Sequence, residues 1–300
     1  MLAMLRAAPR THSHIHKPRA SPPYRQNASL YLLLFFLYPD RTGSIASTVM
    51  AEDNPDVPVG KKRFIPLESN PELMSSLVHK LGLSEKLAFH DVFSIDEPEL
   101  LAFVPRPAHA LLLVFPVSET YERFRRQEDK DTPEYEGHGA EEEVVWYKQT
   151  IGNACGLIGL LHGVSNGAAR ANIHPDSNLA HLIRDAVPLK PADRADLLYE
   201  SEALESAHQS AAGGGDTSAP AAEDNIDLHY VCFVKSGDNN LWELDGRRKG
   251  PLKRGKLSSD EDVLSETALD LGVRSFLKRE SEAGGGDLRF SLITLAESLD

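Results

Sequence analysis

The sequence has few cysteines, no long apolar run and almost no acidic residue near its start. Only two cysteines occur in 300 residues, Cys155 and Cys232, so a framework of several disulfides is excluded and a reducing compartment is the default. The apolar run at 30–38 is too short to span a bilayer, because a transmembrane helix needs about 20 apolar residues. We therefore expect a globular protein without a membrane span.

Acidic residues are missing from the N-terminal part and concentrated in the rest. Residues 1–49 hold six Lys or Arg and one acid, Asp40, which leaves 26 basic and 44 acidic residues and a net charge of −18 elsewhere. Because nucleic-acid binding depends on Lys and Arg contacts to phosphate, this composition argues against a nucleic-acid partner. It suits a basic protein partner, although the same charge would also serve solubility alone.

Residues 1–50 differ in composition from the rest of the chain, and three interpretations are open. The run at 30–38 has the length of a signal-peptide core and is followed by small residues at 44–46. The N-terminal segment, which is poor in acidic residues and contains arginines, also resembles a transit peptide. We favour a third interpretation, in which the protein starts at Met50, where the composition changes abruptly. Residues 1–50 are then a disordered extension or absent from the mature protein.

From residue 61 the hydrophobic pattern is that of a globular domain. An N-cap at Asn70 precedes apolar residues at helical spacing, and the continuous apolar run at 109–115 suits a central strand covered on both faces. We expect helices at 71–81, 97–101, 118–130, 157–164, 178–186, 191–204 and 260–278. We expect strands at 88–93, 109–115, 144–147, 228–234, 241–245 and 288–295, and a basic loop at 247–256.

Residues 206–226 are rich in Gly, Ala and Ser, and no Lys or Arg occurs between Arg194 and Lys235. Such a segment buries too little apolar surface to order itself. The globular pattern resumes directly after it, so we interpret it as an internal loop rather than a domain boundary.

A cysteine at the start of a predicted helix is the first candidate for chemistry. Cys155 precedes the apolar run at 157–164, and Gln149 stands six residues before it. The dipole of a helix N-terminus favours a thiolate there. A lone cysteine among small residues is more often a buried small hydrophobe, so this stretch alone leaves both interpretations open.

The hairpin predicted over 228–245 brings a histidine and an aspartate together. If Val234 faces Asn240 across the turn, then His229 faces Asp245 at the open end, and a register shift of two residues still leaves them diagonal neighbours. A carboxylate so placed can orient an imidazole.

These residues match the needs of nucleophilic acyl transfer, which are a thiolate, a base, a group that orients the base, and oxyanion donors. Cys155 could supply the thiolate, His229 the base and Asp245 the orienting carboxylate. The Gln149 amide and the backbone N–H of Cys155 could bind the oxyanion. His162 and Cys232 are interpreted as structural.

Five stretches resemble the signature of the ubiquitin carboxyl-terminal hydrolases, which are papain-like cysteine peptidases. Those around the candidate site are Gln-Thr-Ile-Gly-Asn-Ala-Cys-Gly at 149–156, Asp-Leu-His at 227–229 and Leu-Trp-Glu-Leu-Asp-Gly-Arg at 241–247. Phe-Ile-Pro-Leu-Glu-Ser-Asn-Pro at 64–71 and Val-Pro-Arg-Pro at 104–107 match as well. The sequence is most similar to the short, single-domain members.

The resemblance covers about residues 61–297 and implies one catalytic domain. The implied fold is α+β and papain-like, with a central antiparallel sheet flanked by helices and a knotted backbone. Cys155 is then the nucleophile, His229 the base and acid, Asp245 the orienting residue and Gln149 the oxyanion donor. The implied reaction is hydrolysis of ester, thioester, amide or peptide bonds at the C-terminal glycine of ubiquitin.

The resemblance also implies partners and a gate. Glu68 and Asp91 match ubiquitin-facing acids of the family, and the basic C-terminal tail of ubiquitin would explain the acidic surface. The segment at about 199–226 corresponds to a crossover loop that limits the size of the leaving group. We expect a monomer in the cytoplasm, or in the nucleus as well, that needs no cofactor or metal ion and binds no nucleic acid or membrane.

Three other functions compete with this one. A catalytically idle ubiquitin-binding module would not need all four site residues. A hydrolase of another ubiquitin-like protein would have the same four. An acyltransferase with a small thioester donor would need a donor pocket, and no motif here resembles one.

Overall fold

The computed structural model describes residues 62–215, 220–222, 224, 227–282 and 289–299. The extension expected at 1–50 lies outside them, as does part of the segment predicted as a loop. Within these residues the chain forms a six-stranded sheet in the order β1-β6-β2-β3-β4-β5, and every neighbouring pair is antiparallel. The strands are β1 (Leu87–Asp91), β2 (Ala110–Pro116), β3 (Leu228–Lys235), β4 (Asn240–Leu244), β5 (Leu252–Lys256) and β6 (Ser291–Glu297).

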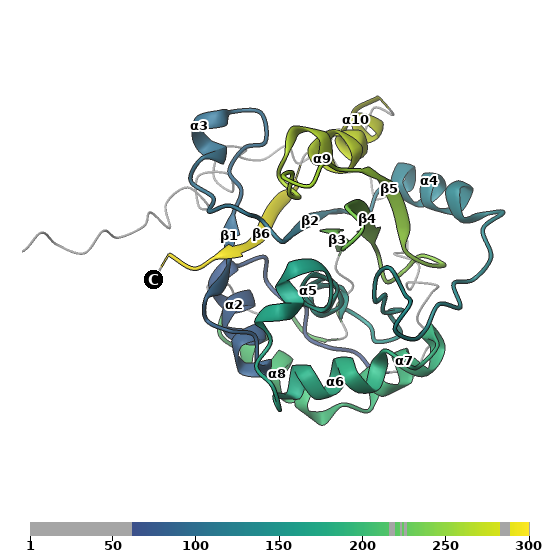
Figure 1. The fold of residues 1–300 in the computed structure, drawn as a ribbon. Helices are drawn as coiled ribbons and strands as arrows, with labels where there is room; N and C mark the ends of the chain where they lie inside the picture. Colours follow the sequence, from purple (N-terminus) through teal and green to yellow (C-terminus); the bar gives the residue numbers. More distant parts are fainter. Residues whose placement is uncertain (1–61, 216–219, 223, 225–226, 283–288, 300) are drawn as a thin grey trace, which may run out of the picture. The chain divides into compact units, whose positions relative to one another are not determined.

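Helices cover both faces of this sheet (Figure 1). On the face that belongs to the larger core, α2 (Pro71–Leu81) and α5 (Cys155–Ser165) contact the strands. The same core also includes residues of α6 (Asn178–Ala186), α7 (Pro191–Tyr199) and α8 (Glu202–Ala212). The other face packs against α9 (Glu266–Leu271) and α10 (Val273–Glu282). The remaining helices are α3 (Pro98–Leu101), α4 (Glu119–Asp129) and the short η1 (Gly167–Asn172). The expected α+β architecture with a central antiparallel sheet is confirmed.

Alternate residues of β2 enter different cores, as the period of a strand requires. Leu112 and Val114 belong to the larger core, whereas Leu111 and Leu113 belong to the core under α9 and α10. The strand predicted at 109–115 is therefore central and buried on both faces.

Helix α5 packs closely against β2 and β3 because glycines line its contact face. A Cβ added at Gly159 would lie 3.2 Å from the Cδ2 of Leu112, and one at Gly163 would lie 3.1 Å from the Cβ of Ala110. Both distances are tighter than ordinary van der Waals contact. The close approach holds the helix that begins at Cys155 directly on the central strands.

Four sequence predictions of secondary structure were wrong in part. The helix expected at 191–204 ends at Tyr199, and Ser201 caps a separate helix, α8, that takes up the first half of the loop expected at 206–226. The cause is tertiary, because Ala207 and Ala211 of α8 are buried in the larger core. The helix expected at 260–278 is divided at Gly272, and the basic loop at 247–256 contains β5.

The prediction of a strand at 144–147 was also wrong. The segment is extended and buried, but its backbone pairs with side chains of α5 and its C-cap instead of another strand. The N–H of Val145 donates to the Asn166 side chain at 2.7 Å, and the N–H of Tyr147 donates to His162 Nε2 at 2.9 Å. Burial lowers the pKa of His162 to about 3, so this ring stays neutral and acts as a structural acceptor.

A buried ion pair joins the connector before this segment to α7. The Arg194 guanidinium is fully buried and contacts the Glu142 carboxylate at 2.7 Å. It also donates to the carbonyls of Ala186 and Trp146 at 3.0 and 2.9 Å. Every nitrogen of this cation therefore has a partner inside the protein.

Replacing Glu142 by alanine is expected to lower the free energy of unfolding by about 3–5 kcal/mol, because the buried Arg194 charge loses its counter-ion. Denaturant unfolding measures the change. Glu143→Ala is the matched control, because its ion pair with Lys253 is exposed, and it should change stability by at most about 1 kcal/mol. Equal effects of the two substitutions would contradict this role of the buried pair.

Among the described residues, no helix has both the length and the apolar character needed to cross a membrane.

Candidate active site

The thiol of Cys155 lies at the first position of α5. The N-cap, Ala154, has no side-chain cap, and Asn153 before it adopts a positive φ of 57° that turns the chain into the helix. The first-turn N–H groups and the helix dipole therefore favour negative charge at this position. Cys155 is half-buried and Cys232 is buried in the larger core, so Cys155 is the accessible thiol of the two.

His229 and Asp245 meet at the open end of the β3–β4 hairpin. His229 Nε2 lies 2.8 Å from Asp245 Oδ1, and the two residues are 2% and 1% exposed. The expected register was wrong by two residues, since Val234 pairs with Trp242. Ser236 pairs with Asn240 around a loop in which Asn239 has a φ of 64°. His229 and Asp245 are therefore diagonal neighbours, the arrangement that such a shift predicts.

The imidazole of His229 interacts with both the Cys155 thiol and the Asp245 carboxylate. Burial alone would lower its pKa, but the Asp245 charge and hydrogen bond, together with a hydrogen bond to Cys155, raise the pKa to about 9. Because Asp245 engages Nε2, the ring nitrogen left for Cys155 is Nδ1. An imidazole with this pKa is protonated at neutral pH and donates from both nitrogens.

The Asp245 carboxylate accepts hydrogen bonds from three groups. His229 and the backbone N–H of Arg247, at 2.9 Å, reach Oδ1, and the Tyr121 hydroxyl donates to Oδ2. Burial alone would raise the pKa of Asp245, but the charge on His229, the two side-chain hydrogen bonds and the Arg248 charge hold it well below its usual range. The group is therefore a carboxylate fixed in orientation.

Gln149 is tied by its backbone to the segment that carries Asp245. Its N–H donates to the carbonyl of Gly246 at 2.8 Å, and the Trp146 indole N–H donates to the carbonyl of Asp245 at 3.1 Å. A Cβ at Gly246 would lie 2.9 Å from the Cβ of Gln149, so only glycine fits there. The buried Gln149 amide donates from Nε2 to Ile151 O at 3.3 Å, and its Oε1 has no partner among the described residues.

Taken together, the four residues come from two segments far apart in the sequence. The 149–155 segment supplies the thiol and the amide, and the hairpin supplies the imidazole and the carboxylate. Such an arrangement can perform acyl transfer through a thiolate. Among the described residues, no group of three or more His, Cys, Asp or Glu side chains could hold a metal ion.

The sequence matches the family described as ubiquitin carboxyl-terminal hydrolase, family 1, over residues 64–277. The protein belongs to this family. It is thus a cysteine peptidase homologous to the deubiquitinases, and the family expected from the motifs is confirmed.

Individual members of this hydrolase family are similar in sequence to this chain over most of its length. Ubiquitin carboxyl-terminal hydrolase isozyme L1 of Rattus norvegicus is 36% identical over 233 residues, which cover 78% of this chain and 98% of that protein. Ubiquitin carboxyl-terminal hydrolase 3 of Arabidopsis thaliana is 35% identical over 237 residues, which cover 79% of this chain and 95% of the relative. The fold is similar to the crystal structure of the Trichinella spiralis UCH37 catalytic domain bound to ubiquitin vinyl methyl ester. That match has a TM-score of 0.59 and 21% identity, and it covers 79% of this chain and 97% of the other.

The two acids that resemble ubiquitin-facing residues of the family lie outside the four-residue group. Glu68 precedes α2 and is half-buried, and both it and Cys155 influence the Tyr230 hydroxyl, whose pKa is raised first by burial and then by these two groups. Asp91 ends β1, which β6 and β2 separate from the strand of His229. Glu68 thus lies in the segment before α2, and Asp91 lies on an edge strand of the sheet.

Sequence reasoning missed the third donor to Asp245. Tyr121 lies in the charged helix α4 and is far from every motif in the sequence. Its only local signal is its place in a helix that comes directly after the central strand. Only the fold shows that its hydroxyl reaches the carboxylate.

Proposed function

We propose that this protein hydrolyses bonds at the C-terminal glycine of ubiquitin through a thioester on Cys155. The observation that carries the proposal is the position of His229, which lies 2.8 Å from Asp245 Oδ1 and interacts electrostatically with Cys155 in a chain of this family. The raised pKa of His229, about 9, keeps the imidazole protonated at neutral pH, and the N-terminus of α5 favours negative charge at the Cys155 sulfur beside it.

The chemical steps start from this pair. The Cys155 sulfur attacks the carbonyl carbon of the terminal glycine, and the carbonyl oxygen becomes an oxyanion. The side-chain amide of Gln149 and the backbone N–H of Cys155 bind this oxyanion. The His229 imidazolium then protonates the leaving amine, alcohol or thiol, and a thioester remains on Cys155.

Hydrolysis of the thioester completes the cycle. His229, now neutral, takes a proton from water, and the hydroxide attacks the thioester carbonyl. The second tetrahedral intermediate uses the same oxyanion donors, and its collapse returns the thiolate of Cys155 and releases ubiquitin with a free carboxylate. Asp245 holds the imidazole in orientation through both halves.

The remaining expectations are part of the same proposal. Glu68 and Asp91 would contact ubiquitin, whose basic tail complements the acidic chain. The segment at about 199–226 would be the crossover loop of a single catalytic domain at 61–297, with the knotted backbone of the family. The protein would act as a monomer in the cytoplasm, and in the nucleus as well, and residues 1–50 would not take part.

Two measurements test the proposed function. Ubiquitin with a C-terminal fluorogenic amide should be hydrolysed, and ubiquitin with a C-terminal electrophile should label Cys155 and not Cys232. The same reagents built on another ubiquitin-like protein are the control for specificity. Tight binding of ubiquitin with neither hydrolysis nor labelling would contradict the proposal and indicate a binding module. Preferential turnover of the other protein would reassign the substrate.

A further inference from the structure

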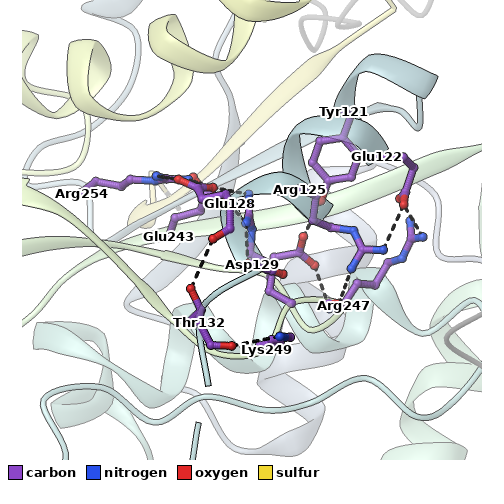
Figure 2. Close-up of polar contacts among 12 residues, drawn as sticks. Tyr121, Glu122, Arg125, Glu128, Asp129, Thr132, Glu243, Arg247, Lys249 and Arg254 are labelled. Carbon is purple, nitrogen blue, oxygen red and sulfur yellow. Dashed lines mark hydrogen bonds and ion pairs between the residues drawn. The ribbon is translucent and has the colours of Figure 1, made fainter. Parts of the chain in front are cut away.

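Helix α4 has a polar face that is turned inward. Its buried residues are Tyr121, Arg125 and Asp129, spaced four apart on one side of the helix. This stripe packs on the chain that comes after β4, the segment that carries Asp245. Figure 2 shows these side chains directed from α4 toward residues of that segment. Although its sequence is that of a charged surface helix, α4 therefore contacts the segment that carries Asp245.

Ion pairs fix the loop to this face of α4. Arg125 donates to the carbonyl of Arg247 at 2.8 Å, and Arg247 contacts Glu122 at 2.9 Å. Arg248 contacts Asp129 at 3.0 Å. These charged groups hold the backbone on the C-terminal side of Asp245 at defined points (Figure 2).

Within this set of contacts, one side chain reaches the carboxylate itself. The Tyr121 hydroxyl donates to Asp245 Oδ2, while His229 lies at Oδ1. The Tyr121 ring packs against Phe115 and Phe276, with centroid distances of 4.8 and 5.9 Å, and the residue is 2% exposed. Tyr121 thus has no surface to offer a substrate. Its ring lies 6.3 Å from the His229 ring between centroids, and its hydroxyl contacts Asp245, so the hydroxyl itself acts through Asp245.

The chemistry of the hydroxyl suits this task. Burial, followed by the charge and hydrogen bond of Asp245, raises the pKa of Tyr121 well above its ordinary value, so the group remains a donor at every working pH. A carboxylate turns about the bond to its Cβ, and donors on both oxygens restrict that rotation. With Oδ2 held by Tyr121, Oδ1 remains directed at His229.

We propose that Tyr121 is a positioning residue for the reaction, which fixes the Asp245 carboxylate so that it orients His229. This inference rests on the proposed function, because it assumes that Asp245 orients the catalytic base. It adds a fifth side chain and a supporting helix, α4, to the four residues that the motifs contain.

The first experiment replaces Tyr121 by phenylalanine, which keeps the ring packing and removes the hydroxyl. By analogy with outer partners of metal ligands, the turnover number on a ubiquitin C-terminal amide should fall by about 10- to 100-fold. KM should remain unchanged, because Tyr121 does not reach the substrate. Tyr135→Phe is the matched control, since it removes a tyrosine hydroxyl that also donates to a carboxylate, that of Glu142, and it should keep full activity.

A double-mutant cycle separates positioning from a general structural effect. If Tyr121 acts through Asp245, Tyr121→Phe should change the rate by less than about 2-fold in an Asp245→Asn background. An equal loss in both backgrounds, or full activity of the single Tyr121→Phe variant, would overturn the proposal for Tyr121. Full activity of Asp245→Asn would instead overturn the proposed function.

A third measurement applies if Tyr121→Phe is too unstable to assay. 3-Fluorotyrosine at position 121 preserves the shape of the ring and makes the hydroxyl a stronger donor. We expect the low-field NMR signal of the His229 Nε2 proton to move upfield, because charge is withdrawn from Asp245. An unchanged signal would rule out the contact as a determinant of the His229–Asp245 pair.

Discussion

Cys155→Ala is expected to lower kcat/KM for a ubiquitin C-terminal amide by about 10⁴- to 10⁶-fold, the scale of losing the nucleophile in a triad hydrolase. No other side chain can replace the sulfur, because Cys232 is buried in the larger core and burial raises its pKa. Steady-state kinetics at high enzyme concentration measure the residual rate.

The same variant separates catalysis from binding. Alanine removes only the sulfur at the start of α5, so Cys155→Ala should bind ubiquitin with a Kd close to that of the native protein. Cys232→Ala is the matched control, and it should retain both hydrolysis and labelling by the ubiquitin electrophile. Substantial turnover by Cys155→Ala would exclude the thioester mechanism.

Asp245→Asn has the second largest expected effect, a fall in kcat/KM of about 10³- to 10⁴-fold, the scale for this change in a Ser-His-Asp triad. The amide cannot match three donors as the carboxylate does, and its NH₂ group favours the wrong tautomer of His229. Asp238→Asn in the turn of the same hairpin is the control, because its exposed side chain bonds within the turn. That variant should stay within about 2-fold of the native rate.

The pH dependence of kcat/KM shows in which direction Asp245 shifts the pKa of His229. Because the carboxylate raises the pKa of His229 to about 9, kcat/KM of the native protein should decline only as the pH passes that value and the imidazolium loses its proton. In Asp245→Asn the negative charge is lost while burial, which lowers the pKa of His229, remains. The alkaline limb should therefore move to lower pH. A limb that stays in place would show that Asp245 does not set the charge on the base.

The sequence by itself determined the four candidate catalytic residues and the pattern of most elements. A helix N-terminus, a strand and a hairpin are local features, so the positions of Cys155, His229 and Asp245 at their ends follow from periodicity and turn chemistry. The central strand at 109–115 was equally clear, because a continuous apolar run of that length is buried on both faces. Motif resemblance then gave the family.

Local sequence patterns gave wrong secondary-structure predictions where a segment found its hydrogen-bond or packing partners in distant parts of the chain. The buried segment at 144–147 is strand-like in sequence, but Asn166 and His162 accept hydrogen bonds from its N–H groups, so no strand forms. The low-complexity segment is partly helical because small residues of α8 fit against the core. Neither outcome is encoded within the segment itself.

Only the tertiary structure decided the role of α4. Hydrophobic patterning assigns a helix face to the core by its apolar residues, and the buried stripe of α4 is Tyr121, Arg125 and Asp129. These groups are buried because polar and charged groups of the segment after β4 bond to them, and that segment is distant in the sequence. A polar group is buried at low cost only when a partner bonds to it. Its burial therefore depends on both partners and cannot be predicted from the segment that contains one of them.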